Sequence, residues 1–180
     1  MDQLKQQISD LAKDNLIDEG VVYASSCLRI EYAYNILPEI RELLLDYQKT
    51  ISSHLCFEDF KKELENLAEY YPLPKGCLFA GFVQDTVAGC VALKPVDRNT
   101  CELKRFYVKP KFRGLGLGVM LLQKAITYAK KQDYNEIVLS TLPVMEKAVS
   151  LYKSCGFVES ESSCHDHVCE SKSYYLNLKG

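Results

Sequence analysis

The fold is decided by the run Arg113-Gly114-Leu115-Gly116-Leu117-Gly118, which follows the apolar segment ending in Tyr107-Val108-Lys109-Pro110 and opens into Val119-Met120-Leu121-Leu122. Its alternating glycines let the backbone approach a ligand without a Cβ in the way. A helix that starts there points its unpaired N–H groups and the positive end of its dipole toward a bound anion. The run therefore predicts a phosphate-binding loop between a strand and a helix, although a tight connection that binds nothing has the same composition.

The composition is that of one ordinary globular domain. The chain has 180 residues, of which 47% are hydrophobic and 26% charged, enough for a single well-filled core. With 22 Lys and Arg against 24 Asp and Glu, the net charge of -2 argues against nucleic-acid binding or a polybasic membrane footprint. The amino terminus is polar, and no apolar stretch approaches the roughly 18 residues that cross a bilayer. We therefore expect a cytoplasmic protein with no nucleic-acid or membrane partner.

The 8 cysteines predict reduced thiols rather than disulfides. The sequence carries no secretion signal, and most cysteines stand beside apolar residues, as in Gly89-Cys90-Val91, where a thiol behaves as a small hydrophobe. The exception is Cys164-His165-Asp166-His167-Val168-Cys169, whose soft ligands raise the question of a transition metal. Because its spacing differs from the usual zinc pattern, we predict no metal.

Hydrophobic periodicity predicts an N-terminal appendage over residues 1–26, a short helix plus a linker, and then an α+β domain over residues 27–180. A right-handed crossover makes the strand expected at 136–140 parallel to that at 101–108, so the sheet is mixed. The expected elements, in order, are a strand at 27–30, helices at 36–45 and 57–70, strands at 77–83, 87–93 and 101–108, a helix ending at 131, a strand at 136–140, a helix opened by Pro143, and a strand pair near 157–160 and 174–178.

The segment from Cys101 to Phe157 resembles the GNAT superfamily of acyl-CoA-dependent N-acetyltransferases. One family signature, Gln or Arg, two residues, Gly, one residue, Gly or Ala, is met by Arg113, Gly116 and Gly118. The second, Ala-x-x-Leu-Tyr-x-x-x-Gly-Phe, is met by Ala148, Leu151, Tyr152, Gly156 and Phe157. The resemblance implies a mixed, mostly antiparallel sheet flanked by helices and splayed between its fourth and fifth strands.

The resemblance also implies acetyl-CoA as co-substrate, without a metal. Its pyrophosphate is expected on the backbone N–H groups at the start of the helix, which is the anion site that the residues themselves suggest. The pantetheine arm, an extended amide chain, is expected to pair like a strand with exposed backbone groups. The implied cofactor-binding residues are Phe106, Tyr107, Val108, Arg113, Gly114, Leu115, Gly116, Leu117 and Gly118.

Acetyl transfer to an amine needs a base. An alkyl amine with a pKa near ~10.4 is free in only about one part in ~10³ at neutral pH, a shortfall worth roughly 4 kcal/mol. Glu102 is the candidate, with water as a relay, because it precedes Arg113 by 113 − 102 = 11 residues, where the histone-modifying branch of the family keeps its catalytic glutamate. The alternative is that Glu102 pairs with Lys104 or Arg105 on the same strand.

The reaction also needs a donor for the carbonyl oxygen and an acid for the leaving sulfur. By resemblance the Val108 backbone N–H serves the first need and the Tyr152 phenol the second, although a tyrosine at that helical spacing is also typical of a core.

Two departures from the family pattern bear on the mechanism. Many relatives place an asparagine at the position of Met145, 152 − 145 = 7 residues before the tyrosine, and an acidic residue where this chain has Ser140 and then Thr141.

The acceptor is expected between the first helices and the late hairpin, over residues 47–57 and 160–174. Histidines on these loops could bind or deprotonate a substrate, and nearby carboxylates would suit a cationic one. We expect a small amine, and a monomer or homodimer; the alternatives are a protein N-terminal or lysyl acetyltransferase, or a non-catalytic acyl-CoA-sensing module. The residues concerned are His54, His165, His167, Glu58, Asp59, Glu159 and Glu161.

Overall fold

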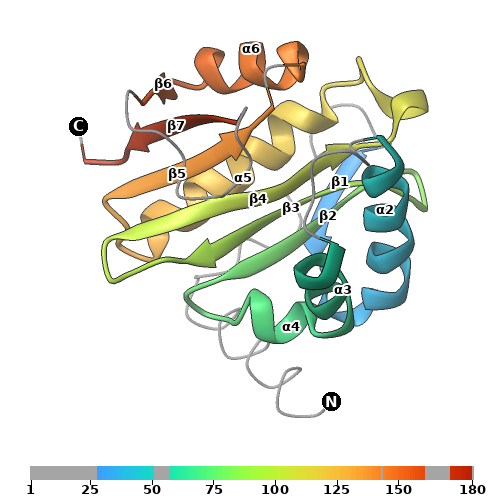
Figure 1. Cartoon of the computed structure of the whole chain (residues 1–180). Coiled ribbons are helices and arrows are strands. Elements are labelled where there is room, and N and C mark those ends of the chain that lie inside the picture. The colour runs from blue at the N-terminus through green and yellow to red at the C-terminus, as the bar shows by residue number, and fades with distance from the viewer. Residues whose placement is uncertain (1–27, 51–56, 143, 161–170, 180) are drawn as a thin grey trace.

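The computed structural model describes residues 28–50, 57–142, 144–160 and 171–179, which form one mixed sheet with helices on both faces (Figure 1). The strand order is β1-β2-β3-β4-β5-β7-β6. The strands are β1 Leu28–Tyr32, β2 Cys77–Val83, β3 Thr86–Pro95, β4 Thr100–Val108, β5 Glu136–Thr141, β6 Val158–Glu159 and β7 Lys172–Asn177. The predicted α+β class and most of the strand positions are confirmed.

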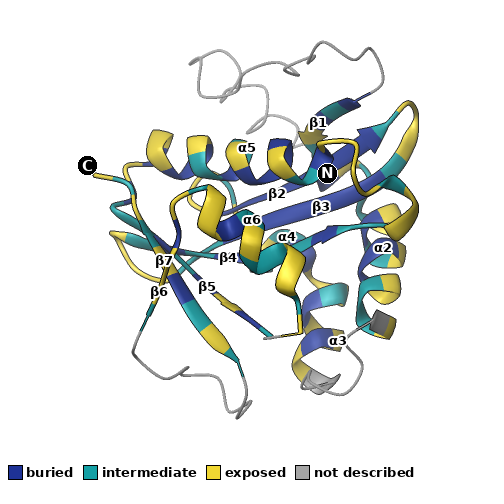
Figure 2. Cartoon of the chain, turned by 90° about the horizontal axis from the view of Figure 1, so that it is seen from above, coloured by how far each residue is buried: buried dark blue, intermediate teal, exposed yellow. Residues whose placement is uncertain are grey.

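The helices divide between the two faces of the sheet, with α5 on one side and α2, α3 and α4 on the other (Figure 2). None of the described helices is long and apolar enough to cross a membrane. Their bounds are α2 Leu37–Thr50, α3 Phe57–Glu65, α4 Leu67–Tyr70, α5 Leu117–Lys131 and α6 Glu146–Ser154, with 3-10 turns η1 Ala33–Asn35 and η2 Pro110–Phe112.

Two predicted helices differ from the structure. The single helix expected over 57–70 is broken at Asn66, which lies outside helical dihedrals at φ -129° and ψ 40°. Its side-chain amide donates instead to the Lys62 carbonyl at 3.0 Å, the kind of local bond by which asparagine competes with a helix. The helix expected from Pro143 begins only at Glu146, and Pro143 lies outside the described residues.

The sheet is splayed where the resemblance predicted. Strands β4 and β5 are parallel, and their register covers three pairs, Thr100 with Glu136, Cys101 with Ile137, and Glu102 with Val138. Beyond Glu102, β4 continues to Val108 beside β3, while β5 pairs with β7. Past this point the described residues of β4 have no partner on the β5 side, which leaves one edge of the strand open.

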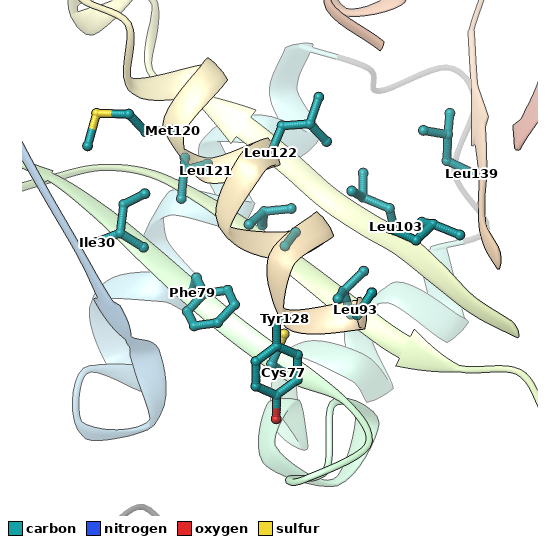
Figure 3. Close-up of a cluster of buried hydrophobic side chains, with 14 of the residues drawn as sticks. Ile30, Cys77, Phe79, Leu93, Leu103, Met120, Leu121, Leu122, Tyr128 and Leu139 are labelled. Carbon is teal, nitrogen blue, oxygen red and sulfur yellow. The ribbon is translucent and has the colours of Figure 1, made fainter. Parts of the chain in front are cut away.

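The core between α5 and the sheet holds the splayed strands in place (Figure 3). Leu121 is fully buried, and its methyl carbon lies 3.2 Å from where a Cβ on Gly89 would be. A Cβ on Gly89 would also approach the Tyr107 carbonyl to 2.6 Å, so only glycine lets β3 run this close to β4. The thiols of Cys77, Cys90, Cys101 and Cys155 are free, as predicted; the other four cysteines lie outside the described residues.

Truncating Leu121 to alanine is expected to lower the free energy of unfolding by about 3 kcal/mol, because it removes buried methyl groups and leaves a cavity under the helix. Denaturant unfolding measures the change. Leu115→Ala is the control, since Leu115 is 52% exposed and its truncation should cost little. Equal losses for the two variants would contradict this description of the core.

Candidate active site

The glycine run forms a loop with open space beside it. Gly114 and Gly116 have left-handed backbone conformations, with φ of +82° and +88°. A Cβ built on either residue would meet no atom within 4 Å. Gly116 is the N-cap of α5, so the first N–H groups of that helix open onto the same space. The loop therefore has the geometry and the partial positive charge that suit a phosphate.

Arg113 fastens this loop to the end of β4. Its Nε donates to the Val108 carbonyl at 3.0 Å, and its guanidinium lies 6.0 Å from the centre of the Tyr107 ring. Of the two leucines in the loop, Leu115 points to solvent and Leu117 is buried in the core. Their side chains are therefore accounted for without a ligand, and what the run offers a cofactor is its backbone.

Three elements converge at Gly118. A Cβ there would lie 3.5 Å from the Phe106 ring on β4 and 3.6 Å from Leu151 on α6, which are ordinary contact distances. The open edge of β4, the start of α5 and the inner face of α6 thus meet within a few ångströms. The structure brings together the predicted residues of the glycine loop, of the strand at 106–108 and of the second signature.

Tyr152 lies at this meeting point, buried on α6. Its ring centre is 5.7 Å from that of Phe106 and 5.8 Å from that of Phe157. Burial raises the pKa of the Tyr152 phenol well above its ordinary value, and the nearby phenol of Tyr47 raises it further. Tyr152 therefore stays protonated at neutral pH, as a hydrogen-bond donor must. Its role as an acid stays a prediction.

Tyr47 reaches the site from the other face of the sheet. It lies on α2, and its ring centre is 5.2 Å from that of Tyr107 on β4. Its phenol is also one of the causes that raise the pKa of Tyr152. Burial raises the pKa of Tyr47 as well, so this phenol is neutral too.

Glu102 stands where the splay begins, since its pair with Val138 is the last one between β4 and β5. The side chain is 22% exposed and accepts a hydrogen bond from the Lys104 ammonium at 3.1 Å. The ion pair that we weighed against a catalytic role is therefore present, with Lys104 and not with Arg105. A carboxylate in a half-buried pair can still accept a proton, and the assignment of Glu102 as base stays a prediction.

The sequence analysis missed a second, more deeply buried ion pair beside the site. Arg105 donates from Nε to Oε1 of Glu63 at 2.6 Å and from Nη2 to Oε2 at 2.5 Å. The Tyr71 hydroxyl donates to the same carboxylate at 2.6 Å. The two charged side chains are 10% and 4% exposed. Burial alone would raise the pKa of Glu63, but the hydrogen bonds and charge of Arg105 outweigh it and hold the pKa below its ordinary value.

Some predicted residues cannot be placed. The three histidines and the run from Cys164 to Cys169 lie outside the described residues. Within the residues that are described, no three metal-ligating side chains gather. Met145, where many relatives have an asparagine, caps α6, and its sulfur accepts a hydrogen bond from the Thr141 hydroxyl at 3.7 Å.

Comparisons with known proteins agree with this arrangement. Residues 37–157 match the model of the Acetyltransferase (GNAT) family. An uncharacterized N-acetyltransferase of Schizosaccharomyces pombe is 38% identical over 134 residues, which make up 73% of this chain and 82% of that protein. Human N-acetylaspartate synthetase is 33% identical over 105 residues, which make up 57% of this chain but 35% of that protein.

Solved structures share the fold over most of its length. A GNAT family acetyltransferase of Staphylococcus aureus superposes with a TM-score of 0.72 at 28% identity, covering 84% of this chain and 99% of that one. The yncA putative acetyltransferase of Salmonella typhimurium, solved with acetyl-CoA, has a TM-score of 0.67 at 18% identity, covering 84% and 94%. With the family model matching well over half of its length, the chain belongs to the GNAT acetyltransferase family and is an acyltransferase.

Proposed function

We propose that this enzyme transfers an acetyl group from acetyl-CoA to the primary amine of a small molecule, by direct attack within a ternary complex. The observation that carries the proposal is the open loop at Gly114 and Gly116, joined through Arg113 to the unpaired edge of β4. An anion site next to an open strand edge fits a ligand that has a diphosphate at one end and an extended amide chain at the other.

The residues of the loop fit such a ligand on physical grounds. A side chain at Gly114 or Gly116 would project into the space that a phosphate needs. The N–H groups at the start of α5 supply donors without a metal ion. Phe106, Tyr107 and Val108 lie on the part of β4 that has no partner on the β5 side among the described strands. Apart from the Val108 carbonyl, which Arg113 binds, their backbone groups on that side can pair with the pantetheine amides.

Three groups of the chain then have distinct tasks. Glu102 takes a proton from the acceptor's ammonium, directly or through water, so that the nitrogen can attack the thioester carbon. The Val108 N–H donates to the carbonyl oxygen as negative charge builds there. Tyr152 donates its proton to the sulfur as the carbon–sulfur bond breaks, so coenzyme A leaves as the thiol. The attacking nitrogen gives up its second proton as it becomes an amide, and this proton restores the Tyr152 phenol. The products are an N-acetylated amine and coenzyme A.

The acceptor is proposed as a small amine of the amino-acid type. Relatives named N-acetylaspartate synthetase carry an amino-acid derivative in their names, although this chain spans only about a third of their length. The site places Lys104 beside Glu102, and a cation at that point would suit an acceptor that bears a carboxylate. A non-catalytic sensor is the second candidate, since Met145 is engaged with Thr141 and Glu102 is already paired.

Thiol release from acetyl-CoA, followed against a panel of amines, amino acids and peptides, tests these functions. We expect release with small amines and little with peptides. Release with peptides alone would make the enzyme a protein acetyltransferase, and tight cofactor binding without release on any acceptor would make it a sensor. Because the protein has 8 cysteines of its own, each reaction needs a matched blank without acetyl-CoA.

Replacing Glu102 by glutamine is expected to lower kcat/KM about 30-fold at pH 7, because the amine must then lose its proton to bulk water. The deficit should shrink as the pH rises toward the pKa of the amine, since the free base becomes more abundant. Lys104→Met, assayed with an amine that bears no carboxylate, is the matched control: it breaks the same ion pair and leaves the Glu102 carboxylate in place. If the two variants lose activity equally and with the same pH profile, Glu102 is an ion-pair partner and not the base.

A further inference from the structure

We propose that the buried pair of Arg105 and Glu63 is a positioning device for the cofactor site. By holding Arg105 in a left-handed backbone conformation, the pair fixes a bulge in β4 that decides which residues of the strand face the cofactor. This inference rests on the proposed function only in calling the affected surface a cofactor site; the bulge and the ion pair belong to the structure itself.

The bulge is visible in the register of β3 and β4. Cys90 pairs with Tyr107 and Ala92 pairs with Lys104, so that Val91 alone faces two residues, Arg105 and Phe106. One extra residue on β4 is the definition of a β-bulge. It falls between Glu102, where pairing with β5 ends, and Val108, where Arg113 attaches the glycine loop.

The extra residue changes the face of the sheet to which the later side chains of β4 point. Before the bulge, Cys101 and Leu103 pack in the core on the α5 side. After it, Phe106 and Val108 pack on that side and Tyr107 packs with α2 on the other. Regular alternation from Leu103 would put Tyr107 on the α5 side, because side chains alternate strictly along a strand.

Removing the bulge would therefore move the side chains that follow it to the opposite faces of the sheet. Phe106, which contacts Tyr152, and Val108, which lies near Gly118, would turn away from α5 and α6. Their backbone N–H and C=O groups would exchange edges as well, because these also alternate along a strand. The predicted oxyanion donor, the Val108 N–H, and the pantetheine contacts both depend on the edge toward which these backbone groups point.

Arg105 is not a residue that adopts such a conformation readily. Its φ is +55°, in a region that residues other than glycine, asparagine and aspartate rarely enter. Three contacts hold it there. The guanidinium binds both carboxylate oxygens of Glu63, and its carbon lies 4.7 Å from the centre of the Phe60 ring. The Arg105 carbonyl accepts a hydrogen bond from the Cys90 thiol at 3.1 Å.

The pair positions the site and does not take part in the chemistry. The guanidinium points toward α3, both oxygens of Glu63 are engaged with it, and the Tyr71 hydroxyl occupies one of them as well. Buried ion pairs add little to stability over an apolar replacement, but they can specify one arrangement of the chain. Here the arrangement specified is the register of a strand.

The test compares alanine and glycine at position 105 in an E63Q background, so that no charge is left buried without a partner. Glycine accepts a positive φ freely and keeps the bulge without the ion pair, whereas alanine favours regular strand dihedrals. We expect E63Q/R105A to bind coenzyme A about tenfold more weakly than E63Q/R105G in calorimetry. Amide NMR shifts of residues 106–108 should move in the alanine variant and stay near wild type in the glycine variant.

Arg41→Ala is the control for general loosening of α3. Arg41 donates to the Leu64 carbonyl at 2.7 Å, so its loss should lower Tm while leaving coenzyme A affinity unchanged. Equal affinities and equal NMR shifts for the alanine and glycine variants would overturn the positioning role. If wild-type protein bound no coenzyme A, the proposed function would fail, and the NMR comparison would still decide whether the pair holds the bulge.

Discussion

Tyr152→Phe is expected to lower kcat about 10²-fold while the dissociation constant for acetyl-CoA stays within about twofold, because donation to the leaving sulfur matters only as the carbon–sulfur bond breaks. The ring keeps its contacts with Phe106 and Phe157, so the fold should lose about 1 kcal/mol or less. Single-turnover kinetics and calorimetry with acetyl-CoA separate the two quantities.

The pH profile sharpens this expectation. Burial and the neighbouring Tyr47 both raise the pKa of Tyr152, so the phenol keeps its proton up to and beyond the ordinary tyrosine value near ~10. Wild-type activity should therefore show no loss from tyrosine ionisation between about pH 8 and pH 10. The matched control is Tyr128→Phe, which removes a hydroxyl that donates to the Pro74 carbonyl at 2.6 Å, at the end of α5 that is opposite to the glycine loop. Should both variants keep full turnover, Tyr152 is a core residue.

The features of this site that could be predicted are those encoded by short, continuous stretches of sequence. Glycines at 114 and 116 are needed because those positions have positive φ, and a run of glycines before an apolar helix signals such a loop directly. The parallel placement of β4 and β5 likewise follows from a strand-helix-strand order and a right-handed crossover. Each of these features is decided by local chemistry.

The bulge and its ion pair could not be predicted in the same way, because they join residues that are 105 − 63 = 42 positions apart. The signal lay in two exceptions to the hydrophobic pattern. Glu63 occupies the buried stripe of α3 and α4 with Phe60 and Leu67. Arg105 stands where the alternation of buried Cys101 and Leu103 would place a third apolar residue. A charge on a buried stripe predicts a partner elsewhere, but only the fold identifies it.

Gly116→Asp is expected to weaken acetyl-CoA binding by more than 10²-fold while the protein stays folded. The φ of Gly116 is +88°, where a side chain is strained, but aspartate tolerates a left-handed conformation better than most residues, so the loss of stability should be about 1 kcal/mol. Its carboxylate would enter the open space of the loop, where repulsion from a phosphate charge at roughly 5 Å is worth about 3 kcal/mol at an effective dielectric constant near ~20.

Gly116→Asn separates the charge from the added volume, since it has the same shape and capping ability without the negative charge. We expect this variant to bind acetyl-CoA about tenfold more weakly than wild type, and the gap between the two variants to narrow at high salt because the repulsion is screened. Thermal unfolding checks that both are folded. If Asp and Asn bind acetyl-CoA equally well at every salt concentration, no phosphate lies against this loop. The glycine run would then be only a tight connection between β4 and α5, and the diphosphate site would have to be sought elsewhere on the splayed sheet.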